Sequence, residues 1–106
     1  MIPPIHLSAL KGQTAALKRL IRPGCDVNRA NEYGATPAYD AADRGQTAAL
    51  DVLVNAGCDV NQPENNGMTP AFIAAQNGQT AALDILVDAG CDVNPGLGTT
   101  DVLPRP

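Results

Sequence analysis

Histidine and aromatic residues are scarce in this chain. Its 106 residues include one histidine, His6, no tryptophan and only three aromatic side chains. A single histidine excludes most Ser–His–Asp and Cys–His constellations, and no serine or cysteine has a visible histidine and acid partner. The rings are too few to stack bases, and the net charge of −4 has the wrong sign for binding phosphates. We therefore expect no enzyme activity, no catalytic residues, no cofactor and no nucleic-acid partner.

Long apolar runs are also missing. No stretch approaches the roughly 18 apolar residues of a membrane span. The segment Met1–Gln13 contains two prolines and no apolar run as long as that of a secretory leader. The cysteines number three, and an odd number does not form a closed disulfide framework. These absences favour an intracellular, cytoplasmic protein that has no membrane partner.

The charges are unevenly placed along the chain. Residues 1–29 carry five basic side chains against one acidic side chain, a net charge of +4, whereas residues 30–106 carry a net charge of −8. The simplest interpretation is that these charges keep exposed surfaces solvated. The alternative is an acidic partner that docks near the basic side chains Lys18, Arg19 and Arg22.

What the sequence does contain is a period of 33 residues. Its landmarks are three cysteines, each within the letters Gly-Cys-Asp-Val-Asn: Cys25, Cys58 and Cys91. The block Gly-Gln-Thr-Ala-Ala-Leu recurs in phase at 12–17, 45–50 and 78–83. A fixed period of this length indicates one structural unit that is copied and stacked, so that neighbouring units bury each other's apolar surface.

The period divides the chain into units of about 1–33, 34–66 and 67–94, which form one domain over residues 1–94. The first unit lacks the opening Gly-x-Thr of the other two. The register is lost after residue 94, where three prolines and two glycines follow without a new Thr-Pro pair. We therefore interpret residues 95–106 as a C-terminal tail.

One unit, residues 34–66, shows the local structure that we expect. The Thr-Pro pair at 36–37 starts a helix, because the hydroxyl caps the first turn and the proline ring suits the first helical position. This helix runs over Pro37–Arg44 and is stopped by a glycine. A longer helix follows at about Thr47–Ala56, with its apolar residues on one stripe. The segment 58–68 is rich in turn residues, including Asn66-Gly67, and the third unit repeats the pattern, with its longer helix at Thr80–Ala89.

These residues resemble the ankyrin repeat. The family pattern is roughly Gly-x-Thr-Pro-Leu-His-x-Ala-Ala, then a Leu-Leu pair and Gly-Ala-Asp-Val-Asn. A Gly-His pair, which holds the family's second histidine, comes before the Leu-Leu pair. Here Gly34–Ala42 and Gly67–Ala75 match the first part of the pattern, and Gly57–Asn61 matches its end. The resemblance covers about residues 1–94 and implies an all-α solenoid of stacked helix-turn-helix units joined by projecting β-turn fingers. It also implies a non-catalytic module that binds a protein or peptide through its fingers and first helices.

The chain departs from the family pattern at a few positions. Alanine stands in place of leucine at 38 and 71, aromatic rings replace histidine at 39 and 72, and glutamine replaces the second histidine at 46 and 79. Only His6 keeps the family's first histidine, and a lone histidine near a helix start is typical of a structural hydrogen-bonding group. We interpret the aromatic rings as filling the volume that the short alanines give up.

A comparison of the units predicts where a partner would bind. Positions 34–61 and 67–94 match at 21 of 28 sites, and five of the seven differences lie on the finger edge or the first helix. If the second helices mainly stack on one another, the exposed positions of the first helices are free to specialise. We expect Tyr33 to be the main anchor, because exposed tyrosine is enriched among interface hot spots. The predicted partner-binding residues, at positions where the family binds its partners, are Lys11, Glu32, Tyr33, Ala35, Asp40, Asp43, Arg44, Asn65, Asn66, Met68, Gln76 and Asn77.

The three cysteines do not predict a metal site. Packed helices lie about 8–10 Å apart, so equivalent atoms of successive units are separated by about that distance. Sulfur ligands must lie about 2.3 Å from one zinc ion, and a disulfide needs Cα atoms within about 7 Å. We therefore expect each cysteine to be a small buried side chain where the family commonly has alanine, with redox sensing as the alternative.

Two other functions stay open beside the binding module. The array is short and its C-terminal end lacks a clear polar capping repeat, so it can be an assembly element that self-associates. We expect the C-terminal end to be covered either by the tail, with Val102 and Leu103 as apolar contacts, or by another chain. The third possibility is a regulatory fragment of a larger enzyme, whose activity would belong to another part of the parent chain.

Overall fold

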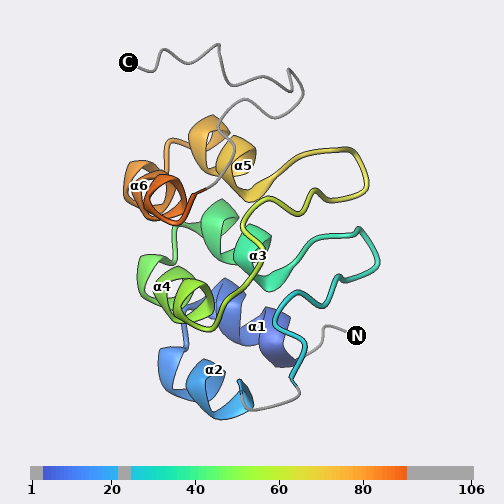
Figure 1. The fold of residues 1–106 in the computed structure, drawn as a ribbon, viewed down its shortest axis with the longest axis vertical. Coiled ribbons are helices and arrows are strands. Elements are labelled where there is room, and N and C mark those ends of the chain that lie inside the picture. The colour runs from blue at the N-terminus through green and yellow to red at the C-terminus, as the bar shows by residue number, and fades with distance from the viewer. Residues whose placement is uncertain (1–3, 22–24, 91–106) are drawn as a thin grey trace.

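Three pairs of α-helices, stacked one on the next, form the part of the protein that the structure describes (Figure 1). The computed structural model describes residues 4–21 and 25–90, and within these ranges it contains helices and no strand. The helices are α1 (Pro4–Lys11), α2 (Thr14–Leu20), α3 (Pro37–Arg44), α4 (Thr47–Asn55), α5 (Pro70–Gln76) and α6 (Thr80–Asp88). The predicted all-α solenoid is therefore confirmed.

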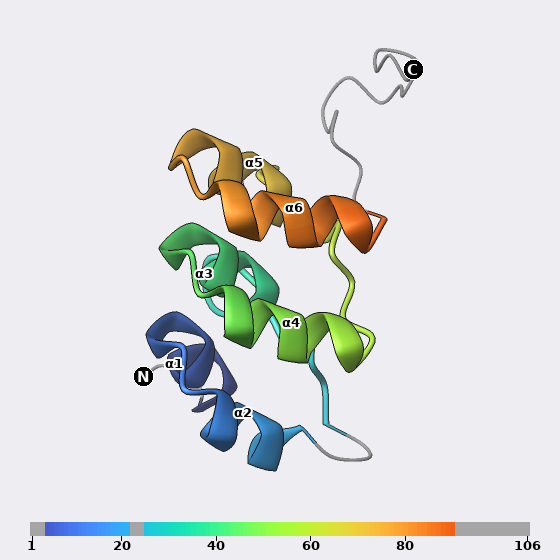
Figure 2. The same cartoon turned by 90° about the vertical axis from the view of Figure 1, so that its left-hand side faces the viewer.

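The helices lie in two rows. The first helices of the pairs form one row, in which α3 packs against both α1 and α5. The second helices form the other row, in which α4 packs against α2 and α6; Figure 2 shows this row from its outer side. The segments just before α3 and just before α5 project away from the helices as two loops (Figure 1). The first helices and the loops therefore meet on one side of the stack.

The first helices of the second and third pairs begin as predicted. Thr36 Oγ1 accepts a hydrogen bond from the backbone N–H of Tyr39 at 3.1 Å, and Thr69 Oγ1 accepts the equivalent bond from Phe72 at 3.2 Å. A proline follows each threonine at the start of the helix. The bounds of α3 agree with the prediction. The second helices end one residue earlier than predicted, because an alanine forms the C-cap of α4 and of α6.

Small side chains fill the space between the two rows. The fully buried alanines are Ala9, Ala38, Ala41, Ala42, Ala49, Ala74 and Ala82. Leucines from the second helices complete the core, and the fully buried ones are Leu17, Leu50, Leu53 and Leu86. Tyr39 is 9% exposed, which agrees with the predicted packing role of its ring, whereas Phe72 at the same position of the next unit is 46% exposed. Helices that carry so many alanines depend on close contact with their neighbours for stability.

A glutamine side chain ties each unit to the one before it. Gln46 Nε2 donates to the carbonyl oxygen of Leu10 at 2.9 Å, and Gln79 Nε2 donates to the carbonyl oxygen of Asp43 at 3.2 Å. Gly45 ends α3 in the left-handed region, with φ +69°, and a Cβ atom added there would collide with the Gln79 side chain. The glycine therefore serves both the helix end and the junction between units.

Some predictions concern segments outside the described residues. Cys91 and the tail at 95–106, with Val102 and Leu103, belong to this group. Within the described residues, no helix is both long and apolar enough to cross a membrane.

Candidate partner-binding face

Each projecting loop is braced by one side chain. In the first finger, residues 31–35, Asn31 Oδ1 accepts from the backbone N–H groups of Tyr33 at 2.8 Å and Ala35 at 3.0 Å. In the second finger, residues 64–68, Glu64 Oε1 accepts from those of Asn66 at 2.6 Å and Met68 at 3.0 Å. Asn31 and Glu64 are 33 residues apart, so the same position of the period fixes both turns. This bracing fixes the shape of both fingers.

The two fingers are also joined to each other. The backbone N–H of Asn65 donates to the carbonyl oxygen of Tyr33 at 2.9 Å, and its side-chain Nδ2 donates to the carbonyl oxygen of Glu32 at 3.2 Å. Nearer the helices, the backbone N–H of Asp59 donates to Asn28 Oδ1 at 2.6 Å. These bonds fix the spacing between the fingers and make one continuous edge.

A hollow of about 460 Å³ lies between the fingers and α3. Each of the three elements contributes three residues to its wall: Asn31, Tyr33 and Ala35 from the first finger, Tyr39, Asp40 and Asp43 from α3, and Glu64, Asn65 and Asn66 from the second finger. Six of the predicted binding residues meet here. Asn31, Glu64 and Tyr39 were not predicted from the sequence as part of this site. The signal for the first two was the shared position of the period, three residues before a glycine in each finger.

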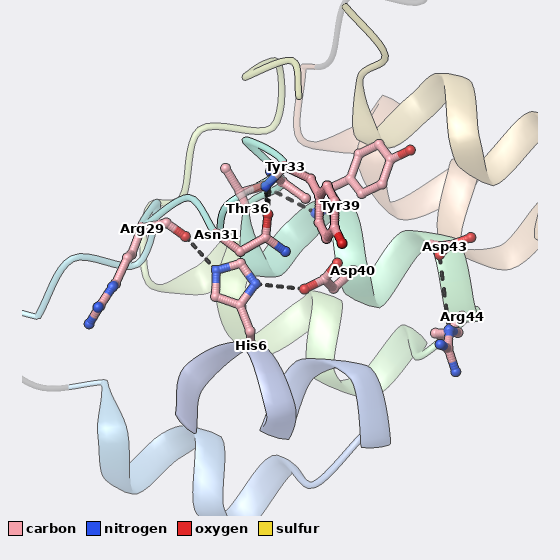
Figure 3. A network of polar contacts seen from close by, with 10 residues as sticks. His6, Arg29, Asn31, Tyr33, Thr36, Tyr39, Asp40, Asp43 and Arg44 are labelled. Atoms are coloured by element: carbon pink, nitrogen blue, oxygen red, sulfur yellow. Dashed lines mark hydrogen bonds and ion pairs between the residues drawn. The ribbon is translucent and has the colours of Figure 1, made fainter. Parts of the chain in front are cut away.

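Tyr39 lies in a negatively charged part of the hollow. Burial raises the pKa of its hydroxyl, and the negative charges of Glu64, Asp43 and Asp40 raise it further. Figure 3 shows Tyr39 and Tyr33 beside Asp40, with Asp43 further along α3. No lysine or arginine belongs to the wall of the hollow. Its electrostatic character is therefore acidic, although the N-terminal part of the chain carries an excess of basic residues.

Asp40 and Ala35 differ from the expectation of exposed binding residues. Both are buried, with 7% and 5% of their surface exposed. Asp40 is covered because His6, from the preceding unit, packs onto it. His6 Nδ1 lies 2.6 Å from Asp40 Oδ2, and Nε2 donates to the carbonyl oxygen of Arg29 at 2.6 Å (Figure 3). The predicted structural role of His6 is confirmed, and it takes the Asp40 side chain away from direct recognition.

The other predicted residues extend the face beyond the hollow. Arg44 is exposed, with Nε 3.9 Å from Asp43 Oδ2, and Asn77 donates through Nδ2 to the carbonyl oxygen of Asp43 at 3.1 Å. Met68 is half-buried against the core. The remaining exposed positions are Lys11, Glu32 and Gln76. The predicted set therefore runs across all three units, with the hollow near its middle.

The cysteines lie apart from this face. Cys25 and Cys58 are free thiols that pack against the core as expected, but each is half-buried and thus less buried than predicted. Burial raises the pKa of Cys58 to about 11, with a further contribution from the charge of Asp59. Among the described residues, no group of three or more histidine, cysteine or acidic side chains could hold a metal ion.

The raised pKa of Cys58 predicts slow thiol chemistry in the native protein. In a variant whose other two cysteines are serine, the native thiolate fraction at pH 8 should be roughly a hundredfold below that of an ordinary thiol. The rate should rise about tenfold per pH unit towards pH 11, because the thiolate is the nucleophile. The reaction rate is measured from the absorbance that appears when Cys58 reacts with an aromatic disulfide reagent. The urea-unfolded chain is the control. Equal native and unfolded rates at pH 8 would contradict the prediction.

The stacked helix pairs and paired fingers define a repeat solenoid. The chain belongs to the ankyrin repeat family: the family profile described as "Ankyrin repeats (3 copies)" matches residues 5–96. A solved structure, the ankyrin repeat domain of human ASB11, is similar with 31% identity and a TM-score of 0.79. The alignment covers 85% of this chain and 41% of that one. No curated protein sequence matches the chain. Ankyrin repeats are generally protein–protein interaction modules, and the family is typically non-catalytic.

Proposed function

We propose that this chain is a non-catalytic, intracellular module that binds a protein or peptide through its two fingers and the first helices, within a domain at residues 1–94. The exposure of Tyr33 carries the proposal. Its side chain stands at the rim of the hollow and is 65% exposed, which is the largest exposed fraction among the large hydrophobic residues described. A tyrosine held by a braced turn offers a rigid contact area at low entropic cost.

The contrast between the two helix rows supports this assignment. The second helices repeat almost the same sequence, and their leucines are used to pack neighbouring units. The first helices and fingers carry most of the differences between units, and their polar side chains line the hollow. A surface that varies between otherwise identical units is free to serve recognition, whereas the repeated surface serves stacking.

The binding role predicts that a double variant loses its partner. Tyr33→Ala with Arg44→Ala removes an exposed ring and an exposed guanidinium, and neither side chain belongs to the core. We expect captured partner from the native source to fall about tenfold or more, since buried tyrosine and arginine contacts dominate interfaces. Quantitative mass spectrometry of the captured proteins measures the loss.

The matched control is Asp51→Ala with Asp84→Ala, which removes two exposed side chains from the second helices. This variant should keep the partner at the wild-type level. Undiminished capture by the Tyr33 and Arg44 variant would place the contact elsewhere, as would equal losses in both variants.

An assembly role is the second candidate, and one observation favours it. Phe72 on α5 and Val87 on α6 are 46% and 48% exposed, although Tyr39, at the position of Phe72 in the preceding unit, is buried. These two residues lie in the last described helix pair, on which no further described helix packs. A molecular mass that rises with concentration in light scattering would distinguish self-association from the binding module.

A further inference from the structure

The hollow combines acceptor groups that are only partly used. Glu64 Oε1 receives two backbone N–H groups, but Oε2 receives only a long contact, 3.4 Å, from Asn66 Nδ2. Asp43 Oδ1 accepts a hydrogen bond from Asn77 Nδ2, but Oδ2 has only Arg44 Nε at 3.9 Å, which is beyond a hydrogen bond. Both carboxylates therefore keep lone pairs for another donor.

Tyr39 provides an independent observation at the base of the hollow. The residue is about nine-tenths buried, and its ring belongs to the wall. Within the part of the chain that the structure describes, its hydroxyl forms no hydrogen bond, whereas its backbone N–H is used by Thr36. The hydroxyl faces the hollow, where a ligand can reach it. A ligand that supplies a donor would satisfy it.

A metal ion does not fit this set of groups. Among the described residues, no three acidic, histidine or cysteine side chains come close enough together to share one ion. Two of the acceptors, Asp43 and Tyr39, lie on α3, and the third, Glu64, lies on the second finger. A larger cation with several donors pointing in different directions matches this spacing better.

We propose that the hollow receives an arginine side chain of the partner. The guanidinium would donate to the carboxylates of Asp43 and Glu64 and to the Tyr39 hydroxyl. The exposed ring of Tyr33 at the rim would cover one face of the cation, since guanidinium groups stack on aromatic rings. Ammonium is a compact point charge without such a face, and it would use fewer of these groups. This inference rests on the proposed function and names the chemistry of its partner.

The test uses the full chain and three small probes. N-acetyl-arginine methylamide, the lysine analogue and the citrulline analogue are titrated separately, and ¹⁵N–¹H spectra record the shifts of backbone amides. Citrulline keeps the shape of arginine but lacks its charge. We expect saturable shifts that centre on the two fingers and α3 with the arginine probe, weaker ones with lysine and none above background with citrulline.

Two variants locate the cation. Asp43→Asn keeps the shape of the side chain and should weaken binding of the arginine probe about tenfold, because the negative charge that strengthens the hydrogen bond to guanidinium is lost. Tyr39→Phe keeps the ring and should weaken it severalfold. The matched control Asp84→Asn removes one exposed charge from α6 and should leave the affinity unchanged. Far-UV circular dichroism verifies that each variant is folded.

Several results would overturn the inference. Equal shifts with citrulline would remove the role of charge, and equal shifts with lysine would remove the selectivity for guanidinium. If Asp84→Asn weakens binding of the arginine probe as much as Asp43→Asn does, the affinity depends on the overall charge of the protein and not on the hollow. If these results appear while the Tyr33 and Arg44 variant still loses its captured partner, the binding module stands and only the arginine assignment fails. If capture is unaffected in that variant, the proposed function itself fails.

Discussion

Replacing His6 by tyrosine is expected to lower the free energy of unfolding by about 3 kcal/mol. His6 is fully buried, and its two ring nitrogens bond to Asp40 and to the carbonyl oxygen of Arg29. Because that carbonyl only accepts, Nε2 carries a hydrogen, and a second hydrogen lies between Nδ1 and Asp40 Oδ2. The substitution leaves a buried carboxylate without its partner. Urea unfolding at pH 7, followed by circular dichroism, measures the loss.

The next unit of the chain suggests a second substitution that should compensate for this loss. Tyr39 and Ile73 occupy, one unit further on, the positions of His6 and Asp40. The double variant His6→Tyr with Asp40→Ile therefore installs at the first junction the residues that already stand at the second. We expect it to recover most of the loss, to within about 1 kcal/mol of the wild type, since an apolar pair can replace a buried polar one at little cost.

The single variant Asp40→Ile completes the cycle. It should lose about 1–2 kcal/mol, because His6 keeps its bond to Arg29 but not its bond to the carboxylate. The three variants together give the coupling energy between positions 6 and 40. A double variant no more stable than His6→Tyr alone would contradict this explanation. That result would show that the loss comes from the steric fit of the histidine ring and not from the unpaired carboxylate.

The helices could be predicted from the sequence because their signals are local. The Thr-Pro pair at 36–37 determines the start of α3 through a hydrogen bond spanning three residues, and Gly45 ends it through its own backbone conformation. Neither signal depends on the rest of the fold. The copies of these signals at a spacing of 33 residues then indicate the stack.

The candidate site could be predicted only in part, because burial depends on residues far away in the sequence. Asp40 occupies a position that varies between units, which favoured an exposed residue, yet His6, 34 residues earlier, covers it. Asn31 and Glu64 were missed for another reason. Their side chains differ, an amide in one finger and a carboxylate in the other, so only their shared place in the period links them. Their role as braces of the fingers emerges from hydrogen bonds within each turn.

Leu50→Ala is expected to lower the free energy of unfolding by about 3 kcal/mol, and Leu83→Ala by about half as much. Both leucines follow the same letters, Gly-Gln-Thr-Ala-Ala, and occupy the same helical position. Leu50, in the middle pair, is fully buried, whereas Leu83, in the last described pair, is half-buried.

The difference between the two leucines measures what a neighbouring unit contributes. Helix α4 packs against α2 on one side and α6 on the other, while among the described helices α6 has only α4 beside it. Truncation at position 50 therefore opens a cavity that two neighbours line, and the same truncation at 83 opens one that solvent partly fills. Chemical unfolding of both variants, with the curves fitted to one shared m-value, tests this difference in the free energy of unfolding. Equal losses would mean that each helix pair is stabilised mainly within itself, and the fold would then be three small units in series instead of a cooperative stack.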